Sequence, residues 1–266
     1  GYELSVNWRD RIHDFRYHIG FNLAYAKNKI VFQDEVPYPY DYMRKTGKPV
    51  GQQMGYKYDG FFSEEDVAKY ETERGKSIPD HVKYKDLNND HKIDQYDVAA
   101  IGYPVYPLLT GGINLGFSYK GFDFSMTWSG ATKVSRLLDD IFREPFGATD
   151  SRSLMKYMID DMWTPEKGNS AKAPAISFTN KVNNYRDSDL WLRDASYLRL
   201  KNVEIGYNFP KKILSKINIG SLRVFATGYN LLTLDKLKIV DPESRPNGNA
   251  MYPVVMVINM GLKVGF

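Results

Sequence analysis

The residues best suited to chemistry lie in one short acidic stretch, residues 86–97. Several oxygen ligands must converge on one ion to bind a hard cation such as Ca²⁺. The stretch has the spacing of a calcium-binding loop at positions 1, 3, 5, 7, 9 and 12, with a main-chain carbonyl at position 7. The sequence therefore predicts a Ca²⁺ site whose ligands come from Asp86, Asn88, Asp90, Lys92, Asp94 and Asp97.

Two features of this stretch depart from the calcium-loop pattern. Position 6, normally a glycine at the sharp turn, is His91, and position 12 is an aspartate instead of the longer glutamate. A left-handed backbone is costly without glycine, although histidine tolerates it better than most residues. The alternative is a solvated acidic turn whose side chains hydrogen-bond the local backbone.

Other candidate catalytic groups do not form a reactive arrangement. Adjacent aspartates occur at 139–140 and 160–161, and carboxylate pairs can act as general acid and base on glycosides. Neighbouring aspartates on a helix point apart, however, which is typical of a solvated face. His13 and His18 are an odd number of residues apart and would lie on opposite faces of a continuous strand. An enzyme is therefore the least favoured class.

The elements that must position the acidic stretch are β-strands. Apolar residues alternate with polar or small ones over residues 2–9, 15–26, 109–119 and 122–129, with a polar turn at 10–14 and a tight turn at Lys120-Gly121. The last thirteen residues alternate without a break. Their apolar face predicts a wall against lipid, and it consists of Val254, Met256, Ile258, Met260, Leu262, Val264 and Phe266.

Two further strands have less regular patterns. In residues 191–209 the apolar positions change from even to odd numbers, which predicts a β-bulge near Lys201 and Asn202. In residues 221–232 two sets of residues compete for the apolar side, and the pattern leaves the orientation open. One set is Leu222, Val224 and Ala226, and the other is Phe225, Thr227 and Tyr229.

The connections between these seven strands alternate between short and long. Outer-membrane barrels have short periplasmic turns and longer extracellular loops. A carboxyl terminus in the periplasm would therefore place residues 28–107, 130–190 and 233–253 outside the cell. We predict an all-β fold, a transmembrane antiparallel β-barrel segment that covers residues 1–266. Seven strands cannot close a bacterial barrel, so further strands are expected from outside this chain.

The two longest loops carry helical patterns. Ser63 can cap a helix with Asp66 three residues later, and Phe62 and Val67 occupy the staple positions, with Gly75 at the end. Apolar residues recur at helical spacing between residues 150 and 163. These patterns predict ordered loops.

Composition narrows the function classes only a little. The chain has 266 residues with 20 Tyr and 14 Phe, which suits aromatic girdles at two bilayer interfaces. A formal charge of +4 without a Lys/Arg stripe argues against nucleic acid as a partner. The absence of cysteine excludes disulfides and thiolate zinc sites within these residues.

Several segments resemble the carboxyl-terminal third of the barrel in SusC-type TonB-dependent transporters. The similar segments follow the family's order over nearly the whole chain, at residues 82–94, 101–102, 112–124, 163–166, 188–207, 222–231, 241–243 and 261–266. The resemblance implies a barrel of about 22 strands with a plugged lumen, which imports bulky nutrients. It also implies a SusD-like lipoprotein lid and a TonB complex that supplies energy. No segment of this chain corresponds to the plug domain or the TonB-contacting part.

The cargo implied by the resemblance is an oligosaccharide, with oligopeptides as the alternative. Aromatic residues in the loops are candidates for sugar contact, at Tyr38, Tyr40, Tyr42, Trp163 and Tyr185. Polar residues expected to face the lumen are Arg16, His18, Asn22, Asn114, Asp123 and Thr127. A second alternative, a secreted calcium-dependent carbohydrate-binding module, requires the apolar strand faces to pack against each other.

Overall fold

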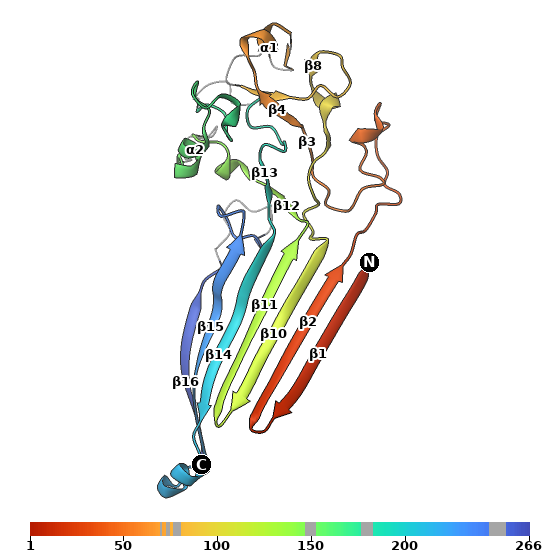
Figure 1. Cartoon of the computed structure of the whole chain (residues 1–266). Coiled ribbons are helices and arrows are strands. Elements are labelled where there is room, and N and C mark those ends of the chain that lie inside the picture. The colour runs from red at the N-terminus through yellow and green to blue at the C-terminus, as the bar shows by residue number, and fades with distance from the viewer. Residues whose placement is uncertain (70, 73–74, 77–80, 147–152, 177–182, 245–253) are drawn as a thin grey trace.

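The computed structural model describes the chain except residues 70, 73–74, 77–80, 147–152, 177–182 and 245–253. Its largest element is one antiparallel sheet of seven long strands, with the long connections gathered in a layer at one end (Figure 1). The strands follow chain order: β1 (Tyr2–Ile12), β2 (Phe15–Tyr25), β10 (Leu109–Tyr119), β11 (Phe122–Thr132), β14 (Tyr197–Asn208), β15 (Ser221–Asp235) and β16 (Val257–Gly265).

The opposite end of the sheet carries the short connections. The β1–β2 turn is two residues long, because Ile12 pairs with Phe15. The first turn residue, His13, adopts a positive φ of 56°. The β10–β11 turn uses Lys120 and Gly121, both with positive φ, as predicted. Between β14 and β15 lie a short helix, α3 (Lys211–Leu214), and a 3-10 turn, η5 (Ser215–Ile217).

Strand pairing shows where the bulge lies in β14 and which side chains of β15 are on the apolar face. The register of β11 against β14 moves from Thr127–Asn202 to Trp128–Leu200, which leaves Lys201 as the extra residue and confirms the predicted bulge. In β15, Val224 pairs with Tyr207 and Leu262. Because cross-strand partners share a face, this pairing resolves the open orientation in favour of Leu222, Val224 and Ala226 on the apolar side.

The loop layer contains short elements only. Its strands are β3 (Met54–Gly55), β4 (Tyr58–Phe61), β5 (Glu71–Thr72), β6 (Gly75–Lys76), β7 (Val82–Tyr84), β8 (Lys92–Ile93), β9 (Ala99–Ala100), β12 (Ser135–Leu137) and β13 (Leu192–Asp194). Its helices are α1 (Glu64–Lys69) and α2 (Lys156–Asp161), with 3-10 turns η1 (Asp41–Met43), η2 (Gln95–Asp97), η3 (Asp140–Phe142) and η4 (Gly168–Ser170). No helix among the described residues is long and apolar enough to cross a bilayer.

Some boundaries differ from the sequence prediction. Ser63 and Asp66 form the predicted capping box, yet α1 ends at Lys69, well before Gly75, because Glu71–Thr72 pairs as a strand with β6 and β8. The strand predicted over 191–209 is two strands, β13 and β14. The first of them pairs with β12 inside the loop layer. The helix predicted between 150 and 163 is confined to α2, and its first predicted residues lie outside the described part.

Candidate functional site

One face of the sheet is apolar from edge to edge. The register aligns the predicted apolar residues of all seven strands on this face. No layer formed by the described residues covers it, and its large side chains are exposed, including Trp8 at 58%, Ile258 at 63% and Met260 at 85%. Exposure of such a surface to water would be unfavourable, and monomeric soluble proteins rarely expose contiguous apolar patches larger than a few hundred Å². The face is therefore suited to lipid.

Aromatic rings gather on this face near the short turns. Phe15 stacks on Tyr17 and Phe117, and Phe117 stacks on Phe124, with ring centroids 5.4 to 5.8 Å apart. Phe122 and Tyr207 continue the cluster at 4.5 Å. Such a band at one edge of the apolar face is typical of the aromatic girdle at a membrane interface.

The other face of the sheet is polar and flat. Directly cross-strand from many of its side chains is a glycine, and a Cβ on that glycine would clash with the side chain that lies over it. These glycines are Gly20 beneath Asn7, Gly112 beneath Asn22, Gly116 beneath His18, Gly206 beneath Asp123 and Gly261 beneath Phe225. Because these side chains lie over glycines, they stay close to the sheet and leave space in front of the polar face.

All six residues expected to face the lumen lie on this polar face, as their register partners show. Thr127 donates a hydrogen bond to Asn114 at 2.9 Å. Arg223 reaches across Gly206 to pair with Asp123, and also contacts Glu204 at 2.5 Å. Sequence analysis missed this charged cluster, because its members are far apart in the chain and only the register brings them together.

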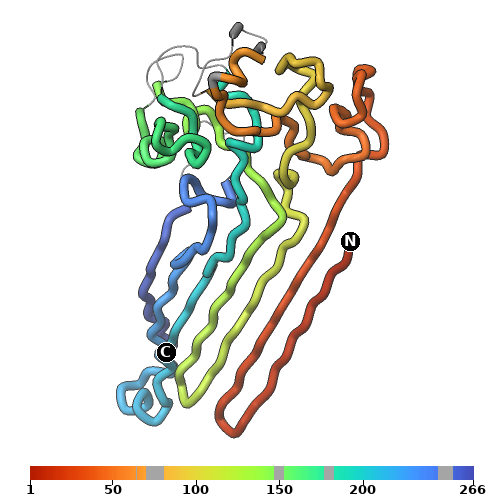
Figure 2. Tube along the Cα trace, turned by 45° about the horizontal axis from the view of Figure 1, so that its top comes forward, coloured from red at the N-terminus to blue at the C-terminus, as the bar shows by residue number. Residues whose placement is uncertain are grey.

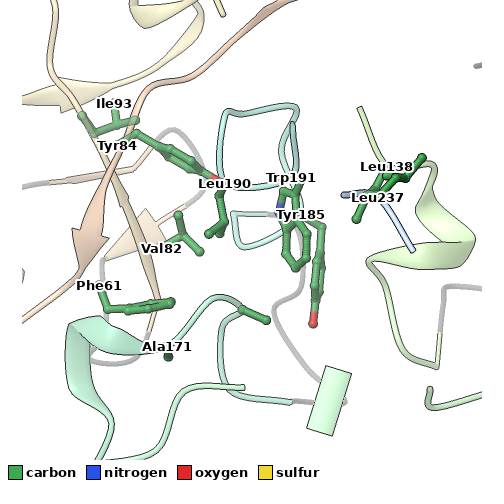
Figure 3. Close-up of a cluster of buried hydrophobic side chains, with 11 residues drawn as sticks. Phe61, Val82, Tyr84, Ile93, Leu138, Ala171, Tyr185, Leu190, Trp191 and Leu237 are labelled. Atoms are coloured by element: carbon green, nitrogen blue, oxygen red, sulfur yellow. The ribbon is translucent and has the colours of Figure 1, made fainter. Parts of the chain in front are cut away.

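The three long connections share one hydrophobic core. It joins Phe61, Val82, Tyr84 and Ile93 from the first connection to Leu138, Ala171, Ala173, Tyr185, Leu190 and Trp191 from the second and Leu237 from the third (Figure 3). Hydrogen bonds reinforce it: the Trp191 indole donates to the carbonyl of Asn184 at 2.9 Å, and Val82 N donates to the Asn184 side chain at 3.0 Å. The loops therefore form one packed layer.

The third connection is also fixed to the sheet by charge. Arg199 on the polar face of β14 is 1% exposed and contacts the carboxylates of Asp241 at 2.5 Å and Glu243 at 2.6 Å. Lys201 contacts Glu243 at 2.8 Å, and Arg136 donates to the carbonyls of Asp241 and Ser244. This Arg199 clamp closes the third connection over the rim of the polar face.

Replacing Arg199 by Met is expected to release the segment that contains Asp241 and Glu243. Both carboxylates would lose their buried partner, and we expect local stability to fall by about 3 kcal/mol. Lys201→Met is the matched control, with an expected loss below about 1 kcal/mol because Lys201 is partly solvated. Hydrogen exchange at residues 236–244 measures both, and equal losses in the two variants would contradict the clamp.

The predicted calcium residues form a closed, self-bonded loop. Asp86 accepts backbone N–H groups from Asn89 at 2.6 Å and His91 at 2.8 Å, and both of those residues have positive φ. Asp97 is fully buried and accepts from the backbone of Leu87 and Asp94, while Asp94 accepts from Tyr96 N. Asn88 donates to Asp90, and Lys92 lies in β8.

These bonds are the ones expected of a solvated acidic turn. Across the described residues, no group of three or more His, Asp or Glu side chains is gathered as a metal site. Burial raises the pKa of Asp97, and the neighbouring carboxylates of Asp86 and Asp94 raise it further. The loop thus concentrates negative charge that a cation would relieve, and Ca²⁺ binding stays a prediction.

The loop aromatics divide into two groups. Tyr185 is 6% exposed within the loop core, and Trp163 packs against that core, so both have structural roles. Tyr40 is exposed and stacks in parallel on Tyr42 at 5.2 Å, while Tyr96 meets Tyr40 edge-on at 6.4 Å. The Tyr42 hydroxyl donates to the Tyr96 carbonyl, which fixes the stack above the acidic loop.

Comparison with known proteins shows what the sequence and the fold of this chain are similar to. No family model matches the chain. Over its full length, the chain is 29% identical to TonB-dependent receptor P3 of Formosa agariphila and 26% identical to TonB-dependent receptor SusC of Bacteroides thetaiotaomicron. The structure of the RagAB peptide transporter superposes on 99% of the chain, with a TM-score of 0.76 and 22% identity. The chain is therefore similar over its full length to SusC-like TonB-dependent receptors, and its fold is that of a segment of such a barrel.

The chain spans 28% of the length of receptor P3, 26% of SusC and 28% of the RagAB chain. The relatives are described as TonB-dependent receptors and as a peptide transporter, in agreement with the low rank given to catalysis. The match also accounts for the exposed apolar face. The open seven-stranded sheet does not fit a carbohydrate-binding module that closes on itself.

Proposed function

We propose that this chain forms wall and rim of a TonB-dependent importer for bulky nutrients. The apolar face lies against outer-membrane lipid, the polar face lines the lumen, and the carboxyl terminus is in the periplasm. The loop layer, including residues 28–107 and 130–190, lies outside the cell. The observation that supports this most strongly is similarity to TonB-dependent receptors over the whole chain, combined with an uncovered apolar face.

The partners follow from the same proposal. A plug domain fills the lumen, a SusD-like surface lipoprotein covers the loop layer, and the TonB complex acts on the plug from the periplasm. The packed loop layer supports the lid contact, since a shared core and the Arg199 clamp give the lid a fixed surface to meet.

The cargo we propose first is an oligosaccharide. The exposed Tyr40 ring, held by its stack with Tyr42 and Tyr96, offers an aromatic face of the kind that sugar rings pack against. Oligopeptides are the alternative, and the solved relative described as a peptide transporter favours testing them in parallel.

The proposal is tested by deleting the gene for the full-length receptor in its native host. Growth on oligosaccharides and on oligopeptides as sole nutrient is compared with growth on their monomers. We expect loss of growth on one oligomer class and normal growth on its monomers, restored by the intact gene. Unchanged growth on every oligomer, together with a protein that fractionates away from the outer membrane, would contradict the proposal.

We also propose that the acidic loop binds Ca²⁺ through Asp86, Asn88, Asp90, Asp94, Asp97 and the Lys92 carbonyl. A raised carboxyl pKa in the folded state favours the protonated form. The stability that Asp97 contributes is thus full below its ordinary value of 3.8 and is lost as pH rises through the raised value. A bound cation would offset this loss, because it requires the ionised carboxylates.

We therefore expect that, without calcium, protection of the loop against hydrogen exchange decreases as pH rises from 4 toward neutral. Added Ca²⁺ should restore it at neutral pH and have little effect near pH 4. Asp86→Ala should remove the calcium response and also weaken the loop by about 1–3 kcal/mol through lost backbone bonds. A calcium titration with neither heat nor added protection would remove the proposal.

A further inference from the structure

The connection between β14 and β15 differs from the other connections at the same end of the sheet. The β1–β2 and β10–β11 connections are tight turns, whereas residues 209–220 contain the short helix α3 and the 3-10 turn η5. In Figure 1 this segment is the light-blue coiled ribbon beside the C mark, beyond the ends of the long strands. Outer-membrane barrels have short periplasmic turns, so a helical segment at this end departs from the usual architecture.

The segment is amphipathic, with two exposed isoleucines on one side. Ile213 and Ile217 are 56% and 60% exposed. They are four residues apart, which makes them neighbours on a helical surface. Leu214 is 2% exposed, and its carbonyl accepts a hydrogen bond from Ile219 N at 3.2 Å. The segment is thus packed against the protein through Leu214, and the two isoleucines point away from that contact.

Three lysines accompany these isoleucines. Lys211, Lys212 and Lys216 are exposed, and residues 209–220 contain no Asp or Glu. Within the described part of the chain, none of the three ammonium groups lies within ion-pair distance of a carboxylate. Lys212 and Lys216 are also four residues apart, so they share one side of the segment. Lysines on one side and large apolar residues on the other are typical of a helix that lies in a membrane interface.

The segment continues directly from the lipid-facing side of the sheet. Phe122 and Tyr207 belong to the aromatic band, and Phe209 meets Tyr207 edge-on, with ring centroids 5.0 Å apart. Phe209 N donates to the carbonyl of Leu222, which is on the apolar side of β15, at 3.0 Å. Pro210 follows as the N-cap of α3. The apolar face therefore extends through Phe209 to the start of the helical segment, at the end where the aromatic band marks the membrane interface.

The sheet on both sides of this segment leaves the isoleucines exposed. Asn208 N donates to the Gly121 carbonyl at 2.7 Å, which fixes the start of the segment to the β10–β11 turn. Gly220 N donates to the Gly265 carbonyl at 2.8 Å, which fixes its end to β16. The neighbours of the segment within the sheet are thus described on both sides. A partner that covers the isoleucines comes from outside this sheet.

We propose that α3 and η5 form an interfacial anchor that inserts Ile213 and Ile217 into the periplasmic leaflet of the outer membrane. The inference rests on the proposed function, which places this end of the barrel in the periplasm. Lys211, Lys212 and Lys216 contact the phosphate groups of phospholipids, and charge complementarity with these anions selects a lipid surface as the partner. The anchor fixes the depth at which the wall around β14 and β15 lies in the bilayer.

Fluorescence quenching in the full-length receptor tests the proposal. After replacement of any native cysteine by serine, Ile213→Cys, Ile217→Cys and Ser215→Cys each carry a bimane label. The receptor is reconstituted in vesicles of phosphatidylethanolamine and phosphatidylglycerol. Lipids with a nitroxide near the headgroup quench labels in the interface, and iodide quenches labels in water. Ser215 is exposed and lies between the two isoleucines in the sequence, so it is the matched control.

We expect the nitroxide lipid to quench the labels at 213 and 217 severalfold more than the label at 215, and iodide to show the reverse order. Iodide quenching at 213 and 217 equal to that at 215 would place the segment in water and overturn the proposal. Shielding of 213 and 217 from both quenchers would assign them to a contact with the plug or with a periplasmic protein, and would overturn it as well.

A second readout isolates the lysines. Phosphatidylglycerol should increase lipid quenching at position 213 over that in zwitterionic vesicles, and Lys212→Gln with Lys216→Gln should remove the increase. Lys27→Gln with Lys29→Gln, exposed at the opposite end of the sheet, should preserve it. Equal loss in both double variants, or no response to phosphatidylglycerol in the wild type, would contradict headgroup binding by these lysines. Absence of nutrient import by the wild type would instead contradict the proposed function, while the quenching remains readable.

Discussion

Met260→Arg is expected to impair insertion of the barrel into the outer membrane. Met260 lies near the middle of β16, is 85% exposed and shares the apolar face with Ile258 and Leu262. An arginine near the bilayer midplane on a lipid-facing strand costs about 2–4 kcal/mol. Urea titration of the full-length receptor in lipid vesicles, followed by the heat-dependent shift of folded barrels in gels, measures the change.

Asn259→Arg provides the matched control for this substitution. Asn259 is the preceding residue on the same strand, and its register partner is Thr227 on the polar face. The same charge introduced there faces the lumen, so we expect a loss below about 1 kcal/mol. If both arginines destabilised the receptor equally, the two faces of β16 would not differ in environment, and the lipid-facing assignment would be wrong.

Trp191→Ala is expected to unfold the loop layer while the long strands of the sheet remain folded. Trp191 is 2% exposed, contacts residues of the shared core and donates its indole N–H to Asn184. Replacing a buried tryptophan by alanine costs about 3–5 kcal/mol. Hydrogen exchange at β7 and around Tyr185 should report this loss, whereas exchange in β10 and β11 should stay unchanged.

Phe32→Ala is the control for loss of an aromatic ring in the loops. Phe32 is 83% exposed and takes no part in the shared core. Its replacement should leave the exchange of β7 within about 0.5 kcal/mol of the wild type. Loss of binding to the proposed SusD-like lipoprotein in Trp191→Ala but not in Phe32→Ala would connect the packed layer to that proposed partner. A loop layer that kept its protection in Trp191→Ala would contradict the shared core.

The strands were predictable because one face meets a uniform environment. When every second residue from Phe15 to Tyr25 must be apolar, the alternation is visible in sequence and the bulge at Lys201 appears as a change of phase. Figure 2 shows these long antiparallel strands side by side below the loops. The orientation of β15 required the register, because Phe225 lies on the polar face over Gly261 and disguises the pattern.

The loop layer was less predictable, since its core combines residues from three distant connections. The capping box at Ser63 is local and was recognised, but the end of α1 depends on pairing of Glu71–Thr72 with β8, some twenty residues later. Arg199 gave no local signal either, because its partners Asp241 and Glu243 come from a different connection. Tertiary contacts of this kind override local propensity.

An accessibility scan along β16 tests the central claim most directly. The chain has no cysteine. After replacement of any cysteine elsewhere in the full-length receptor by serine, single cysteines at residues 257–264 can each carry a spin label in lipid vesicles. We predict contact with lipid-soluble oxygen at positions 258, 260, 262 and 264, and shielding from lipid at the odd positions between them. Equal exposure of both sets, or contact of the even set with a water-soluble relaxant, would contradict a barrel wall.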